Sequence, residues 1–359
     1  MKRKVKQMIQ KEFNLLEEPW ILVMRPDSST EEVSLLEVFE RAHQWRGLAG
    51  ELPTQDVAVL RLLLAILHAV FARYSFEGKF EPIKSPANAL ERWKSIWDLG
   101  RFPIKIIADY LLNFQNRFWL FHPEYPFYQV AGLDKATDYT AAKLNGELAE
   151  SNNKIRLFPQ RTRDGKEVLS FSEAARWLLY VNAYDDTSAK PKRKGLPSPG
   201  TGWLGKLGLV IAIGDTLFHT LLLNLVLLKD GGNILWGAEK PIWEQPVKAD
   251  ERTSITMPDN PSELLTLQSR RLLLKREGDA VTGYMLLGGD FFAKENAFSE
   301  QMTVWRKVTT RKNEPPEYHP KRHDPTRQIW RDFSTLLAQG DGSRRPGVVN
   351  WLARLKADD

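Results

Sequence analysis

The chain has 359 residues, of which 42% are hydrophobic and 27% are charged, including 12 Trp and 17 Phe. This length fits one large domain or two ordinary ones, with enough apolar side chains for a sizeable core and too little compositional bias for disorder. Because the chain has no cysteine, disulfides, thiolate catalysis and cysteine-ligated zinc are excluded.

The net charge of +6 allows an anionic partner, and this charge is unevenly distributed. Residues 151–206 contain 11 Lys and Arg and 5 Asp and Glu, a surplus of six that equals the net charge of the whole chain. The basic start of the chain is not followed by the apolar run of a signal peptide, and the apolar stretch 217–228 is too short to span a bilayer. We therefore expect a cytoplasmic protein with one basic region.

In the first half of the chain, apolar patterning predicts two strands and four helices. We expect the strands at residues 20–24 and 31–36, and the helices at 34–43, 55–74, 86–98 and 103–116, the second of them capped by Thr54.

In the second half, a helix is expected from Ser172 to Tyr184 and a loop from Asp185 to Gly202. Residues 207–228 predict a strand or turn leading into a buried helix, residues 231–310 are strand-like, and further helices are expected at 324–338 and 348–356. The predicted fold class is therefore α+β, with a helical front half, a loop-rich basic centre and a β-rich back half.

Catalytic and metal-binding motifs are weak. The six His form no zincin arrangement, and no Walker A or dinucleotide motif is present. His319 and His323 lie at i and i+4, but Pro320, Pro325 and the Lys and Arg between the two His favour a solvated basic turn over a metal site. Asp185 and Asp186 are interpreted as part of a solvated loop. We predict no catalytic residue, no metal and no cofactor.

Two basic segments are the candidate nucleic-acid contacts, since cations neutralise phosphates, amides reach bases or phosphates and an aromatic ring stacks on a base. The first segment, 152–163, is alternatively an ordinary solvated loop with one anchoring Phe. Its candidate residues are Asn153, Lys154, Arg156, Phe158, Gln160, Arg161 and Arg163.

The second segment, 190–205, joins a run of cations to glycines that let the backbone approach a phosphate or a narrow groove. A tether of similar composition is the alternative. The candidate residues here are Lys192, Arg193, Lys194, Gly195, Ser198, Gly200, Thr201 and Gly202.

An ordered set of short motifs resembles the CasA family, the large subunit of the type I-E CRISPR Cascade complex. The segment 13–23 resembles the family's opening, with Leu22 in place of the usual Pro, and 35–46 resembles the helix that follows. The remaining matches are the turn His122-Pro-Glu-Tyr-Pro-Phe-Tyr-Gln129, the apolar run 221–228 and Ile242-Trp-Glu-Gln-Pro246.

The resemblance implies a non-catalytic subunit of an RNA-guided antiviral complex. Such a subunit recognises the protospacer-adjacent motif in duplex DNA, aids unwinding of the target and helps recruit a helicase-nuclease, while guide pairing reads the sequence. The implied partners are CRISPR guide RNA, double-stranded target DNA, other Cascade subunits and the helicase-nuclease effector, with no membrane.

By position, the segment 152–160 resembles the family loop at the guide handle, and 195–202 resembles the glycine loop beside the recognition motif. Gly288 stands where several relatives have a lysine that enters the minor groove, and Lys294 is a nearby candidate. Residues 270–279 occupy the region of a cysteine cluster found in some relatives. Residues 1–359 correspond to the family's N-terminal domain, without its C-terminal four-helix bundle.

Two alternatives stay open: a metal-dependent nuclease that uses Asp185, Asp186 and His319 or His323, and a stand-alone basic protein that binds DNA or RNA.

Overall fold

The structure is a computed structural model that describes residues 11–147, 157–186, 200–308, 315–324, 326, 333–337 and 343–357. The helices are α1 (Leu35–Glu40), α2 (Pro53–Phe71), α3 (Pro86–Leu99), α4 (Ile104–Leu112), α5 (Ala141–Leu144), α6 (Phe171–Tyr184), α7 (Leu217–Leu223), α8 (Pro261–Leu265), α9 (Phe333–Leu337) and α10 (Gly347–Ala357). Short 3-10 helices are η1 (Gln115–Arg117), η2 (Arg163–Lys166), η3 (Leu204–Lys206) and η4 (Ile242–Glu244).

The strands form four small antiparallel sheets in the described residues. Their orders are β1-β5, β3-β2-β4, β6-β8-β7 and β10-β9-β11. The strands are β1 (Glu12–Asn14), β2 (Ile21–Met24), β3 (Thr30–Val33), β4 (Gly47–Leu48), β5 (Trp119–Phe121), β6 (Thr137–Thr140), β7 (Arg270–Glu277), β8 (Ala280–Gly288), β9 (Trp305–Val308), β10 (Glu317–Pro320) and β11 (Ser343–Arg344).

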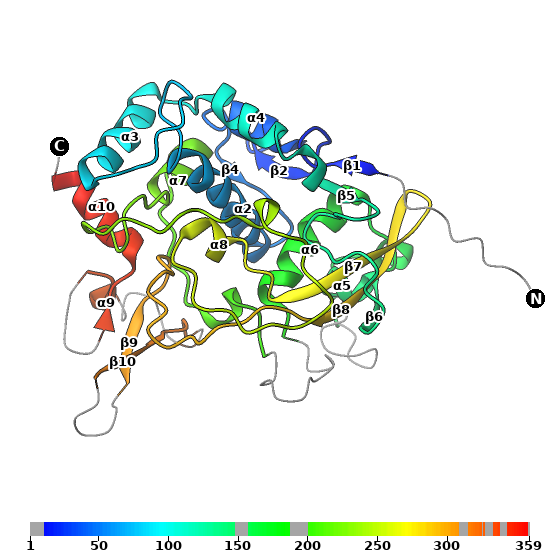
Figure 1. The fold of residues 1–359 in the computed structure, drawn as a ribbon. Coiled ribbons are helices and arrows are strands. Elements are labelled where there is room, and N and C mark those ends of the chain that lie inside the picture. The colour runs from blue at the N-terminus through cyan, green and yellow to red at the C-terminus, as the bar shows by residue number, and fades with distance from the viewer. Residues whose placement is uncertain are drawn as a thin grey trace, which may run out of the picture.

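Helix α2 lies in the middle of the molecule and organises its core (Figure 1). It packs against α4, α6, α7 and α8, and its residues from Ala58 to Phe71 are buried. Helix α2 is long and apolar enough to cross a membrane. In this fold, 83% of its apolar stretch is buried inside the protein. The helix begins at Pro53 with Leu52 as its N-cap, so the predicted Thr54 cap is wrong. Proline at the first position lacks an N–H group that would need a hydrogen-bond partner, and the helix starts two residues earlier than predicted.

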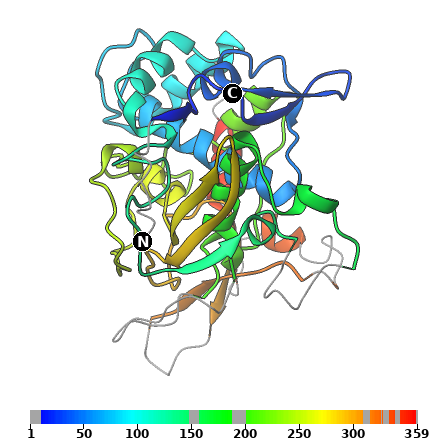
Figure 2. The same ribbon diagram turned by 90° about the vertical axis from the view of Figure 1, so that its right-hand side faces the viewer.

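The other parts surround this helix (Figures 1 and 2). Helices α3 and α4 lie on the side opposite the β9–β10 pair, which projects from the molecule. The long β7–β8 hairpin covers one face and carries β6 at its edge. A second, smaller core lies between the hairpin and the β9 strand; its buried residues are Trp203, Leu204, Leu207, Leu264, Phe292, Ala297 and Trp305.

Most predicted helices are confirmed, and the mixed helix-and-sheet class is correct. The helix predicted at 172–184 is α6, whose Ser170 and Glu173 form a capping box. The strand-like interpretation of residues 231–269 is wrong, because this stretch is largely irregular. Its prolines at 241, 246, 258 and 261 lack the N–H group that a sheet ladder requires. The helix predicted at 324–338 is confirmed at α9, whereas Asp324 is not helical; most of the residues between them lie outside the described ranges.

A buried carboxyl gives the fold a pH dependence that can be measured. Glu239 accepts a hydrogen bond from the Ser262 amide at 2.9 Å, and its Oε1 has no partner among the described residues. Burial raises the pKa of Glu239 from 4.5 to about 7. The folded chain therefore binds this proton more tightly than the unfolded chain, so the contribution of Glu239 to stability falls as pH rises from about 4.5 to 7.

We expect Glu239→Gln to be more stable than the wild type at pH 8, by on the order of 2 kcal/mol, and to lose this advantage near pH 5. Urea unfolding at both pH values measures the effect. Burial lowers the pKa of His68 from 6.5 to about 3. The contribution of His68 to stability therefore falls as pH drops below 6.5, whereas that of Glu239 falls as pH rises. The difference between variant and wild type isolates Glu239, and a difference that does not change with pH would contradict the assignment.

Candidate nucleic-acid interface

The predicted glycine loop follows α6 in the sequence, and the structure describes the chain again from residue 200; we call residues 200–206 the glycine segment. The Gly202 amide donates to the Asp185 carbonyl at 3.0 Å, and the Thr201 hydroxyl donates to the Asp186 carboxylate at 2.7 Å. These two bonds join residues 185 and 186 to the glycine segment. Lys206, in η3, ends the segment.

The two described glycines of the prediction have different roles. Gly200 is exposed, has φ +60° and would place a Cβ in open space, so it keeps the property expected of a glycine that faces a ligand. Gly202 is buried, and a Cβ there would lie 2.2 Å from the Ala183 carbonyl oxygen. The close approach that requires glycine at 202 is therefore made to α6 of the same chain, which corrects its interpretation as a residue that leaves room for a DNA groove.

We expect Gly202→Val to lower the stability of the free protein, by about 3 kcal/mol or more, because the side chain overlaps main-chain atoms of α6. Thermal unfolding of the free chain measures this. Gly200→Ala is the matched control: it adds only left-handed strain of about 1–2 kcal/mol and no overlap. A Gly202→Val protein as stable as the wild type would show that the segment moves away from α6 without loss.

The glycine segment forms one edge of an open basic pocket of about 630 Å³. Its other walls come from the loop after β8 and from the β9–β10 pair, which are far from the segment in sequence. The lining residues are Thr201, Lys206, Lys294, Arg306, His319, Pro320, Lys321 and Arg322. Two predicted contact residues, Thr201 and Lys294, are thus brought together.

The described lining of the pocket is electropositive. No carboxylate belongs to its described lining. Lys294, Arg306 and Arg322 are exposed, and none of the three is ion-paired to a carboxylate within the described ranges. Burial and the neighbouring charges of Arg270 and Lys294 lower the pKa of Lys206. A cluster of like charges of this kind is relieved by a bound anion such as a phosphate.

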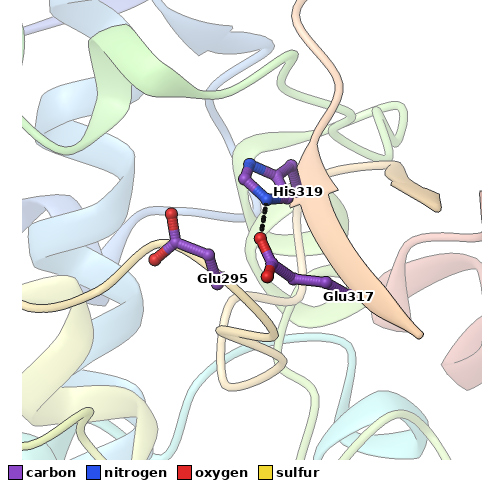
Figure 3. A group of neighbouring side chains, drawn as sticks. All are labelled: Glu295, Glu317 and His319. Carbon is purple, nitrogen blue, oxygen red and sulfur yellow. Dashed lines mark hydrogen bonds and ion pairs between the residues drawn. The ribbon is translucent and has the colours of Figure 1, made fainter. Parts of the chain in front are cut away.

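One group beside the pocket has the composition of a cation site (Figure 3). His319 and Glu317 lie two residues apart on β10, hydrogen-bond to each other and face Glu295 on the adjacent loop. The three could each offer a ligand atom, and these atoms lie within 4.8 Å of one another. His323 is not part of this group, because its ring nitrogen contacts the Leu209 carbonyl at 2.9 Å. The flanking cations of the pocket oppose a bound metal ion.

The first basic segment is described from residue 157 onward. Phe158 is 84% exposed, so it is not a core anchor in this structure. The amides of Gln160 and Arg161 both donate to Glu147, at 2.9 and 3.1 Å. The Arg161 side chain is 14% exposed and pairs with Glu51 and Glu173, so it holds the segment to the fold. The backbone of Arg163 begins η2.

The remaining candidates lie outside the described residues, and their proposed contacts stay predictions. They are Asn153, Lys154, Arg156, Lys192, Arg193, Lys194, Gly195 and Ser198.

The nuclease alternative is weakened by the environment of Asp185. Its carboxylate is bound by the Arg270 guanidinium at 2.7 Å, and the two side chains are 7% and 1% exposed. Asp186 accepts the Thr201 hydroxyl at 2.7 Å. A carboxylate held in a buried ion pair is a poor metal ligand, because binding a metal would leave the guanidinium buried without a counter-charge.

Comparison with known proteins identifies the family. The family model described as "CRISPR-associated protein Cse1" matches residues 14–359. The chain belongs to the Cse1 family. The CasA/Cse1 protein of Thermus thermophilus is 31% identical over 335 residues, which are 92% of this chain and 61% of that protein. The chain therefore spans about three fifths of the length of this curated relative.

Solved Cse1 structures have the same fold. The Thermobifida fusca Cse1 structure is 35% identical, with a TM-score of 0.80 over 96% of this chain and 67% of that one. Acidimicrobium ferrooxidans Cse1 is 32% identical, with a TM-score of 0.77 over 97% of this chain and 65% of that one. A chain of a "CRISPR RNA-guided surveillance complex", at 20% identity and a TM-score of 0.71 over 95% of this chain and 68% of that one, shares the fold. The family resemblance seen in the motifs is confirmed.

Within this Cse1 fold, sequence reasoning missed most of the pocket. It did not select Lys206, Arg306, Lys321 or Arg322. The available signal was the cluster of Lys and Arg at 321 and 322, which was interpreted as a solvated turn. The charge excess in residues 151–206 pointed to only one wall of the pocket, because the other walls come from residues 294–322.

Proposed function

We propose that this Cse1 chain is a non-catalytic, cytoplasmic subunit of the CRISPR Cascade complex that binds duplex DNA beside the protospacer-adjacent motif. The observation that carries the proposal is the open pocket whose exposed cations have no ion-pair partner within the described residues. Because a phosphate backbone offers closely spaced negative charges, such a pocket fits DNA better than a small neutral ligand.

The pocket residues would bind DNA in two ways. Lys294, Arg306 and Arg322 would neutralise phosphates, which fixes the position of the duplex but carries no sequence information. Thr201 and the exposed backbone at Gly200 would lie closest to the base edges, where a short motif is read. Guide RNA pairing would supply the rest of the specificity.

The assembly role is part of the same proposal. The side chains of Leu157 and Phe158 are 85% and 84% exposed. They would contact guide RNA or a neighbouring Cascade subunit, because removing large apolar side chains from water lowers the free energy. Aid in target unwinding and recruitment of the helicase-nuclease complete the proposed function.

The test is reconstitution of the complex with and without this chain. We expect the complete complex to bind a duplex that carries the motif at least tenfold more tightly than one with a scrambled motif, since each mismatched base pair typically costs about 1–3 kcal/mol. The complex without the chain should lose this ratio but keep guide-dependent binding to a single-stranded target, which contains no motif duplex. Electrophoretic mobility shifts at one fixed salt concentration measure both.

Phe158→Ala should impair incorporation of the chain into the complex and leave the thermal stability of the free chain unchanged, because the ring is exposed. Metal-dependent cleavage of DNA by the purified chain that disappears in Asp185→Ala would instead support a nuclease. A motif ratio unchanged by omission of the chain would contradict motif recognition.

A further inference from the structure

Arg270, the first residue of β7, is buried beside the glycine segment and contacts both flanks of the loop. Its Nε donates to the Asp185 carboxylate at 2.7 Å. Its Nη2 donates to two carbonyl oxygens, that of Asp185 at 2.5 Å and that of Gly200 at 2.6 Å. Its Nη1 donates to the Ser269 carbonyl at 2.7 Å. One guanidinium therefore joins the end of α6 to the start of the glycine segment.

The neighbouring Arg271 shows what a buried arginine of this hairpin does without such a contact. Its side chain is also 1% exposed and also pairs with a carboxylate, that of Asp290, at 2.6 Å. Its remaining bonds go to the carbonyls of Ala249 and Gln268. The two arginines have equal burial and each pairs with a carboxylate, although Asp290 is also paired with Lys248 at 3.2 Å. Of the two arginines, only Arg270 bonds to the glycine segment.

The contact at Gly200 has a direct link to the basic pocket. Gly200 precedes Thr201, which lines that pocket together with Lys206. Gly200 has φ +60°, a conformation from which a glycine moves readily to others, and the hydrogen bond from Arg270 is one of the contacts that hold it. Burial, and next the charge of Arg270, lower the pKa of Lys206.

We infer that Arg270 is a positioning residue for the DNA site. By its hydrogen bonds to Asp185 and Gly200 it holds the Gly200–Thr201 backbone in a fixed position for the duplex. The inference rests on the proposed function. A segment that is ordered before binding loses less conformational entropy when DNA binds. Arg270 makes four bonds, to three carbonyls and a carboxylate, from three nitrogen atoms of one planar fork, whereas a lysine has three donors on a single nitrogen atom.

The first test measures motif discrimination in the reconstituted complex. Arg270→Gln should lower the affinity ratio between motif and scrambled duplexes by roughly tenfold, the factor that one charge-assisted hydrogen bond contributes. Arg270→Lys should recover part of the ratio. Arg271→Gln is the control: it removes an equally buried guanidinium from the same hairpin and should leave the ratio unchanged. Because Asp290 keeps its pair with Lys248, the unfolding temperature should fall less than in Arg270→Gln.

The second test needs no DNA. Hydrogen exchange of the Gly202 amide, which donates to the Asp185 carbonyl, reports whether the base of the loop stays closed in the free chain. We expect exchange at this amide to accelerate in Arg270→Gln and to keep its wild-type rate in Arg271→Gln. Equal exchange rates in the two variants would contradict the inference that Arg270 holds the glycine segment in place.

Faster exchange together with an unchanged motif ratio would overturn the positioning role. A wild-type complex with no motif ratio would overturn the proposed function and the DNA role of Arg270 with it, while the exchange rates would still decide whether Arg270 holds the loop. The failure of each idea is therefore seen in a different measurement.

Discussion

The triple variant Lys294→Ala, Arg306→Ala and Arg322→Ala should bind duplex DNA far more weakly than the wild type. The slope of log affinity against log salt should fall by up to ~0.9 for each phosphate that is no longer neutralised, and the affinity by up to about tenfold per phosphate near ~0.1 M salt. The physical reason is that these exposed cations have no ion-pair partner among the described residues, so a phosphate is their main counter-charge. Fluorescence anisotropy across a salt series measures both quantities.

A second triple variant controls for net charge. Lys79→Ala, Lys84→Ala and Lys105→Ala also removes three positive charges, all from exposed positions near α3 and α4, on the side of the molecule opposite β9 and β10 (Figure 1). We expect its salt slope to match that of the wild type. If both triple variants bound DNA equally weakly, net charge would explain binding and the pocket would have no special role.

Arg61→Met should destabilise the protein by about 3–5 kcal/mol, because it leaves a buried carboxylate without its cation. Arg61 lies on α2 and binds both oxygens of Glu300, at 3.0 and 2.9 Å, with side chains that are 3% and 1% exposed. Glu300 also accepts the Trp203 indole N–H at 2.8 Å and the Met302 amide at 3.1 Å. The pair therefore joins the central helix to both the glycine segment and the strand that follows Glu300. The midpoint of urea unfolding measures the loss.

The double variant Arg61→Met with Glu300→Gln separates the ion pair from the packing. Trp203 and Met302 donate to different oxygens of Glu300, so a glutamine keeps an acceptor for only one of them, but it carries no charge. Because no buried charge is left unpaired, the double variant should be more stable than Arg61→Met alone. Strictly additive losses in the two single variants would show that the charges do not interact. Lys105→Met, which breaks an exposed pair with Asp109, should leave the midpoint unchanged.

The local elements could be predicted from short stretches of sequence because their causes are local. Helix α6 is predicted from Ser172 onward, and the capping box of Ser170 and Glu173 sets its first residue at Phe171. Helix α2 was expected from its apolar residues, although its first residue was misplaced. The strand-like prediction for residues 231–310 is wrong over 231–269, where four prolines lack the N–H group that a sheet ladder requires.

The family motifs and the excess of basic charge are also properties of the sequence itself, and the family match confirms the motifs. The pocket is not such a property. Lys206, Lys294, Arg306 and Arg322 are spread over more than a hundred positions, and they meet because β9 pairs with β10 and the glycine segment returns beside them.

Tertiary structure also determines which cations are exposed and available to bind a partner. Arg161, Arg270 and Arg61 look like the pocket cations in the sequence, but each is buried or nearly so and paired with a carboxylate of a distant segment. Packing also explains the glycine at position 202, because a Cβ there would overlap the carbonyl of Ala183. Helix and turn preferences arise from contacts within a few residues, so the sequence by itself determines them. Ion pairing and burial depend on how distant segments pack, and only the folded chain sets them.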